Sequence, residues 1–72
     1  MQNFKNSNMK IQKNVLYRIN PLIELDDKDT FLLTEVGKLG SYFERHVDGD
    51  KSVTDDAYFN NTELEAGVLV EA

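Results

Sequence analysis

The sequence predicts a small α+β domain with one or two N-terminal strands, one central amphipathic helix spanning about residues 29–47 and a possible C-terminal strand. Three observations predict this class. Apolar residues alternate with polar ones near the start of the chain, they recur at helical spacing in its middle, and the short apolar run Val68-Leu69-Val70 lies near its end. A mostly α domain is the alternative. Two or three strands and one helix barely form a hydrophobic core. We therefore expect contacts with a partner or self-association to complete the core.

The first predicted strand begins at Met9. Its apolar residues have a spacing of two that is interrupted only at Lys13, which is typical of a strand with one buried face: Met9, Ile11, Val15, Tyr17 and Ile19. A helix over the same residues is the alternative, and it would leave Met9 and Tyr17 off the apolar side. Asn20-Pro21 ends the segment, because proline has no amide hydrogen and disfavours a helical conformation in its predecessor. A second short strand is expected at residues 22–25.

The central helix is predicted from five apolar residues at spacings of 4, 3, 4 and 4, which confine them to a sector of roughly 80° on a helix: Leu32, Val36, Leu39, Phe43 and Val47. The acidic residues at positions 26, 27 and 29 precede this segment, where the helix dipole favours negative charge. Arg45 and His46 fall in the last predicted turn, and Gly49 follows as a stop signal. These end signals agree with the helical spacing.

Gly37 and Gly40 lie inside the predicted helix, where each costs about 1 kcal/mol relative to alanine. The competing interpretation breaks the helix at residues 37–40 and begins a second helix at Ser41, whose spacing to Glu44 matches a capping box. We favour the continuous helix. The substitution Gly37→Ala would then stabilise the protein, whereas a loss of stability would indicate a turn.

The last third of the chain has weaker signals. An acidic loop follows Val47, and Thr54 or Asp55 is placed to cap a short helical turn near residues 55–60. A capping box is expected at residues 62–65, followed by a strand over residues 67–70.

The net charge of −5 conceals an asymmetry. Residues 1–23 carry four Lys or Arg and no acid, for a net charge of +4, whereas residues 24–72 carry all thirteen acids and four bases, for a net charge of −9. We predict a flexible, basic and Asn-rich arm over residues 1–8 and a single small domain over residues 9–72. The predicted partner-binding residues are Phe4, Lys5, Lys10, Lys13 and Arg18. We expect them to contact an acidic surface of this domain, of a second copy or of a protein partner.

The chain lacks the usual signatures of an enzyme. A domain of 72 residues leaves little interior for an active site. His46 is the single histidine, no cysteine accompanies it, and no serine lies in a Gly-x-Ser-x-Gly context. A lone histidine at the end of a predicted helix is typical of a surface group. We therefore predict no catalytic residue and no cofactor.

One loop partly matches a calcium site. Oxygen-bearing side chains occupy alternate positions, and the candidate ligands are Asp48, Asp50, Ser52 and Asp56. Val53 stands where such loops need glycine, and Phe59 stands where they need a bidentate glutamate. The favoured interpretation is therefore a solvated acidic loop without a metal.

These observations favour a non-enzymatic protein-interaction module, either a small accessory subunit of a larger assembly or a docking regulator. The alternative is an acidic inhibitor that imitates DNA and occupies a nucleic-acid-binding protein. We do not expect direct binding of nucleic acid, because the acidic residues 24–72 would repel phosphates. No apolar run is long enough to span a membrane, and the lack of cysteine fits a cytoplasmic protein.

Overall fold

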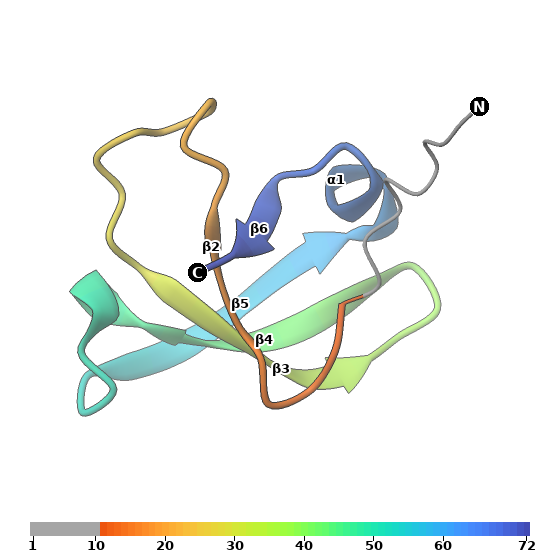
Figure 1. Cartoon of the computed structure of the whole chain (residues 1–72). Helices are drawn as coiled ribbons and strands as arrows, with labels where there is room; N and C mark the ends of the chain where they lie inside the picture. The colour runs from red at the N-terminus through yellow and green to blue at the C-terminus, as the bar shows by residue number, and fades with distance from the viewer. Residues whose placement is uncertain (1–10) are drawn as a thin grey trace.

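The computed structural model describes residues 11–72, which form one antiparallel β-sheet and one short helix. The sheet has the strand order β5-β4-β3-β2-β6 (Figure 1). Its strands are β2 (Leu16–Ile19), β3 (Thr30–Val36), β4 (Gly40–His46), β5 (Thr54–Asn60) and β6 (Leu69–Glu71). The 3₁₀ turn η1 (Val47–Gly49) follows β4, and the helix α1 (Asn61–Glu65) joins β5 to β6. The α+β prediction and its mostly α alternative are therefore both wrong.

The predicted central helix over residues 29–47 is replaced by a β-hairpin. β3 and β4 pair from Thr30 opposite His46 to Val36 opposite Ser41. Residues 37–40 form the turn, in which the Gly37 amide donates a hydrogen bond of 2.8 Å to the Gly40 carbonyl. Among the five residues at helical spacing only Phe43 is buried, whereas Val36 and Leu39 are 67% and 72% exposed. The apolar stripe expected on the helix therefore does not exist.

A bulge in β3 explains why the hairpin resembles a helix in the sequence. Phe31 and Leu33 alternate toward the core, but the pairing with β4 shifts between Leu33 and Glu35. The extra residue breaks the two-residue period, which is the main sequence signal of a strand. The two glycines do mark a break, as the two-helix alternative required, but strands lie on both sides of it.

The predicted helical turn near residues 55–60 is also wrong, because these residues form β5. The helix begins only after that strand. Its N-cap is Asn60, whose side-chain oxygen accepts a hydrogen bond of 2.8 Å from the Glu63 amide, while the Glu63 carboxylate accepts one of 2.9 Å from the Asn60 amide. This reciprocal capping box lies two residues before the expected one, and Ser41 belongs to a strand.

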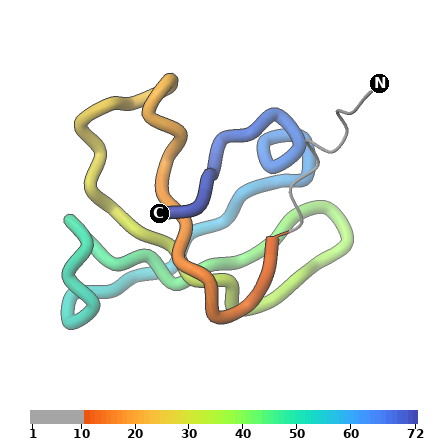
Figure 2. Tube along the Cα trace, in the orientation of Figure 1, coloured from red at the N-terminus to blue at the C-terminus, as the bar shows by residue number. Residues whose placement is uncertain are grey.

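The first and last strands of the described chain pair with each other in the sheet. β2 lies within the strand expected from Met9 onward but begins only at Leu16, after a turn in which Asn14 has a positive φ of 66°. β6 runs antiparallel to β2, with Ile19 opposite Leu69. The C-terminus therefore lies beside β2 in the trace of Figure 2. The second strand expected over residues 22–25 is part of the β2–β3 loop.

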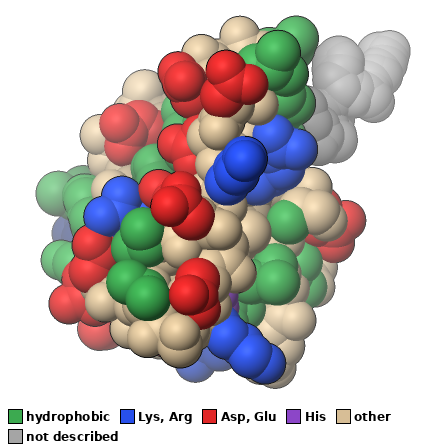
Figure 3. All heavy atoms as spheres, turned by 90° about the vertical axis from the view of Figure 1, so that its left-hand side faces the viewer, with side chains coloured by type: hydrophobic (Ala, Val, Ile, Leu, Met, Phe, Trp, Pro, Cys, Tyr) green, Lys and Arg blue, Asp and Glu red, His purple; other side chains and the backbone are tan. Residues whose placement is uncertain are grey.

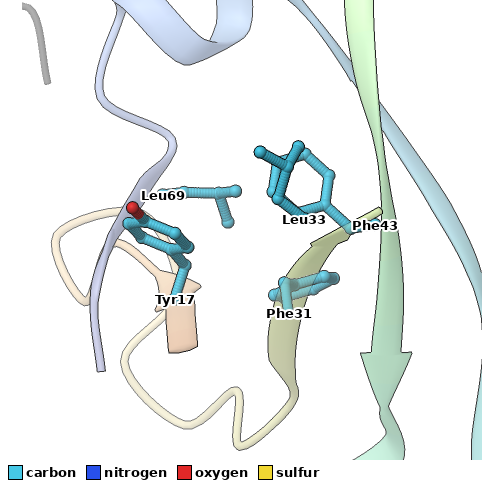
Figure 4. Close-up of a cluster of buried hydrophobic side chains, with 5 residues drawn as sticks. All are labelled: Tyr17, Phe31, Leu33, Phe43 and Leu69. Carbon is cyan, nitrogen blue, oxygen red and sulfur yellow. The ribbon is translucent and has the colours of Figure 1, made fainter. Parts of the chain in front are cut away.

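The core lies on one side of a curled sheet. Figure 4 shows side chains of β2 and β6 pointing toward those of β3 and β4. The buried apolar residues are Tyr17, Phe31, Leu33, Phe43 and Leu69. Phe59 of β5 packs against this cluster, with its ring 5.3 Å from Phe31 and 5.5 Å from Phe43 in edge-to-face geometry. Such pairs contribute about 0.5–1.5 kcal/mol each beyond their buried area, which matters in a core of this size.

The substitution Gly40→Ala is expected to destabilise the protein. A Cβ atom at this position would lie 2.5 Å from the backbone oxygen of Phe59 and 2.5 Å from the hydroxyl of Tyr58. β5 must shift to relieve the clash, which should lower the free energy of unfolding by about 1–3 kcal/mol. Urea unfolding measures this loss.

Gly37→Ala is the matched control, because a Cβ atom there meets its nearest neighbour, the Gly40 oxygen, at 3.0 Å. We expect a smaller loss than for Gly40→Ala. Wild-type stability in Gly40→Ala would contradict the close approach of β4 and β5. A gain in stability for Gly37→Ala would mean that the Gly40 oxygen moves aside without loss.

Candidate functional site

The side of β3, β4 and β5 that points away from the core carries an aromatic pair. Tyr42 and Tyr58 lie directly opposite each other, with ring centroids 4.8 Å apart and ring planes at 52°. Their neighbours Phe43, Ala57 and Phe59 pack into the core, so the alternation of a strand turns both tyrosines outward. The two residues are 48% and 46% exposed. We define the outer face as Glu35, Tyr42, Glu44, Asp56 and Tyr58.

Gly40 makes room for the ring of Tyr58. A Cβ atom at Gly40 would lie 2.5 Å from the Tyr58 hydroxyl and 2.6 Å from the Tyr58 Cζ atom. The end of the Tyr58 ring therefore occupies the space that a side chain at position 40 would fill. Tyr42 flanks the same ring. The orientation of Tyr58 is therefore restricted before any partner binds, which lowers the entropy cost of using it as a contact.

Open depressions adjoin the tyrosine pair. One, of about 410 Å³, is lined by both tyrosines together with Thr34, Glu35, Asp56 and Ala57. The other, of about 270 Å³, is lined by both tyrosines and the hairpin residues 37–40. Small-molecule sites usually enclose most of their ligand. Open hollows of this kind are better suited to side chains presented by another protein.

Carboxylates surround the tyrosines. Glu35 lies opposite Tyr42 in the sheet, and Glu44 lies opposite Asp56. Within residues 11–72 no Lys or Arg forms a salt bridge with these three acids, and Glu44 has only His46 at 3.6 Å. The outer face is therefore aromatic and negatively charged.

A second group of exposed apolar side chains lies in the β2–β3 loop. Leu22, Ile23 and Leu25 are 92%, 57% and 72% exposed. Asn20 orders the start of this loop, because its amide donates to the Val68 carbonyl at 2.8 Å and its side-chain oxygen accepts from the Leu22 amide at 2.9 Å. Figure 3 shows the side of the molecule toward which this loop and η1 lie in Figure 1, with acidic side chains spread across it.

Arg45 links two acids near the other end of the hairpin. It donates two hydrogen bonds to Asp55, which lies opposite it in the sheet, and one of 3.2 Å to Asp29. Asp29 also accepts a 2.8 Å hydrogen bond from the Asp48 amide. The paired guanidinium lowers the pKa of Asp55, and the carboxylates raise the pKa of Arg45. This cluster joins β4, β5, η1 and the β2–β3 loop, which is a structural role.

The candidate calcium ligands are not gathered into one site. Asp50 turns back on its own loop and accepts hydrogen bonds from the Ser52 amide and hydroxyl, which lower its pKa. Asp48 contributes its amide to Asp29, and Asp56 belongs to the outer face. No group of three or more His, Cys, Asp or Glu side chains in the described part of the chain could hold a metal ion.

Of the predicted partner-binding residues, the structure describes only Lys13 and Arg18. Phe4, Lys5 and Lys10 lie outside the described residues. Lys13 is exposed in a turn, and Arg18 lies on β2 between β3 and β6. Arg18 lines a hollow of about 390 Å³ together with Leu25 and the acidic end of the β2–β3 loop.

His46 is buried at the end of β4, with 6% of its surface exposed, and does not end a helix at the surface as expected. Its Nδ1 atom lies 3.4 Å from the Thr30 hydroxyl, across the hairpin. This position makes His46 part of the packing between β3 and β4.

Sequence reasoning missed Tyr42 and Tyr58. The expected helical turn near residues 55–60 contains Tyr58, and the expected helix over residues 29–47 contains Tyr42 without giving it a role. The signal that could have found them is the glycine pair at 37 and 40, because a hairpin turn there makes Ser41-Tyr42-Phe43 a strand with Tyr42 on its outer side.

Comparison of the chain with family models, with curated proteins and with solved structures finds no match. Among the described residues, no helix has the length and apolar character needed to cross a membrane.

The titration of Asp55 is expected to report the ion pair with Arg45. Its lowered pKa means that the pair stabilises the fold at neutral pH, above the unfolded-state pKa. This stabilisation is lost as the pH falls through the lower folded-state pKa. Carbon-detected NMR of the carboxyl groups measures the midpoint, which should lie below that of an ordinary aspartate.

The variant Arg45→Gln should raise the titration midpoint of Asp55 toward that of an ordinary aspartate. Protonation of Asp55 should then contribute less to acid unfolding. Asp50 is the internal control, because its main partner is Ser52 and its midpoint should stay low in the variant. An Asp55 midpoint that does not respond to Arg45→Gln would mean that the pair does not form in solution.

Proposed function

We propose that the protein is a non-enzymatic protein-interaction module, an accessory subunit or a docking regulator, that binds its partner through the outer face. The observation that carries this proposal is the pair Tyr42 and Tyr58, which stays about half exposed although the two residues lie opposite each other on paired strands.

Tyrosine suits a contact surface for physical reasons. Its ring offers a large apolar area with few rotatable bonds, and its hydroxyl tolerates both water and a polar partner. Aromatic residues are accordingly enriched at protein interfaces and among the residues that dominate binding energy. Here Gly40 and the strand pairing already restrict the rings, so little freedom is left to lose on binding.

An acidic inhibitor of a nucleic-acid-binding protein is the second candidate. Its support is the composition of residues 11–72, which hold thirteen acids and six Lys or Arg, with acids spread over the side seen in Figure 3. Such an inhibitor would depend on the number of carboxylates, whereas the favoured module depends on the tyrosines. The cytoplasmic location stays a prediction from the sequence.

The double variant Tyr42→Thr/Tyr58→Thr tests the proposal. Threonine keeps a good strand former at both positions, so the loss of stability should be limited to the cross-strand contact, about 0.2–1 kcal/mol. Loss of a central aromatic contact typically costs about 2 kcal/mol or more of binding energy. Quantitative mass spectrometry after affinity purification from the native host should therefore show a partner present in fixed stoichiometry with the wild type and lost with the variant, while circular dichroism shows an unchanged fold.

Leu22→Ser/Leu25→Ser is the matched control, because it removes two exposed apolar side chains at another place. We expect it to retain the partner. Retention by the tyrosine variant with loss by the loop variant would contradict the assignment of the outer face. A partner that both variants retain and that duplex DNA displaces would favour the inhibitor.

A further inference from the structure

We infer that the outer face binds an arginine-bearing cationic segment of the partner protein, with the guanidinium on the tyrosine pair and between Glu35 and Asp56. This inference rests on the proposed function and specifies the chemistry of the partner.

The tyrosine pair offers a site for a cation. A guanidinium within about 6 Å of an aromatic ring centre is attracted by the negative face of the ring. The two rings are tilted at 52° instead of stacked flat, and each residue stays about half exposed. Part of the aromatic surface therefore remains open to a ligand.

The carboxylates lie where they would reinforce this attraction. Glu35 on β3 and Asp56 on β5 both line the depression of about 410 Å³ that also contains the tyrosines. A cation seated there has acids on two sides, contributed by strands that flank β4. Charge and aromatic surface thus converge on one position.

The acids of the outer face contrast with those near Arg45. There, Asp55 and Asp29 receive a guanidinium from the chain itself. Within residues 11–72 neither Glu35 nor Asp56 takes part in a salt bridge with Lys or Arg. A cation from another protein would form ion pairs with the acids of the outer face, as Arg45 does with Asp55 and Asp29 within the fold.

Arginine fits this position better than lysine. Its planar group stacks on an aromatic ring and donates two parallel hydrogen bonds to a carboxylate, and it sheds water more easily than an ammonium group. The basic segment of this chain does not fill the role equally well, because residues 1–10 contain Lys5 and Lys10 but no arginine. We therefore assign the occupant to a partner.

The second depression extends the inference along the segment. It lies against the same tyrosines and is lined by Leu39, which is 72% exposed, by Lys38 and by the two glycines of the hairpin. This hollow suits an apolar side chain that neighbours the arginine. The segment that fits best therefore combines arginine with a nearby apolar residue.

The test uses a blocked peptide of alternating Arg and Ser residues as the probe, added to the full chain and followed by NMR. We expect shifts concentrated on Tyr42, Tyr58, Glu35 and Asp56. The same peptide with citrulline in place of arginine keeps the shape without the charge and should bind about tenfold more weakly. Affinity should also fall between about 0.05 and about 0.5 M NaCl, because exposed charges are screened.

Two charge-matched variants separate a site from general acidity. Glu35→Gln/Asp56→Asn should weaken binding of the arginine peptide about tenfold. Asp26→Asn/Asp27→Asn removes the same charge from the β2–β3 loop and should leave the affinity within about twofold. Equal weakening by both variants, or equal binding of the citrulline peptide, would overturn the inference.

The variant Lys5→Gln/Lys10→Gln tests the other source of cations. If it shifts the Tyr42 and Tyr58 resonances of the free chain, the occupant is the chain's own basic segment and the inference of a partner is overturned. Failure of the arginine peptide to bind, with a copurified partner that still depends on the tyrosines, would remove this inference and leave the proposed function in place.

Discussion

The close approach of β4 to β5 at Gly40 is the constraint on which the rest of the structure depends. A side chain at this position would collide with the backbone of Phe59 and with the ring of Tyr58. Because Gly40 has no side chain, the hairpin turn closes and β5 pairs along the whole of β4. This pairing brings Phe59 into contact with the aromatic core. The same gap orients Tyr58 on the opposite side of the sheet. One glycine therefore serves both the core and the candidate contact surface.

The charged residues of the sheet differ in whether they are paired within the fold. Near η1, Arg45 neutralises Asp55 and Asp29 and ties a long loop to the sheet. On the outer face the acids surround aromatic rings without such a partner in the described chain. Exposed ion pairs contribute little to stability, so the acids of the outer face do not need an internal partner for the fold to persist. The proposed binding to another protein would use these acids.

Little of the fold beyond β2 could be anticipated from local sequence, and the reason is physical. The alternation around Val15, Tyr17 and Ile19 fits β2 and the residues that lead into it, because a strand with one buried face shows its two-residue period directly. The hairpin could not be anticipated in this way. Apolar residues on two strands and their turn happened to recur at helical spacing, and the bulge in β3 removed the competing two-residue period. The glycines at 37 and 40 were visible, but a turn between helices explained them equally well.

The sequence by itself determined the charge asymmetry and the lack of cysteine. These are properties of composition, which folding does not change. Only the tertiary structure decided that Tyr42 meets Tyr58, that His46 is buried and that Glu35 and Asp56 line one depression. The pairs lie 16 and 21 positions apart in the chain. The register of the strands brings such residues together. This register is set by hydrogen bonds and core packing between residues far apart in the sequence, which a local sequence pattern does not reveal.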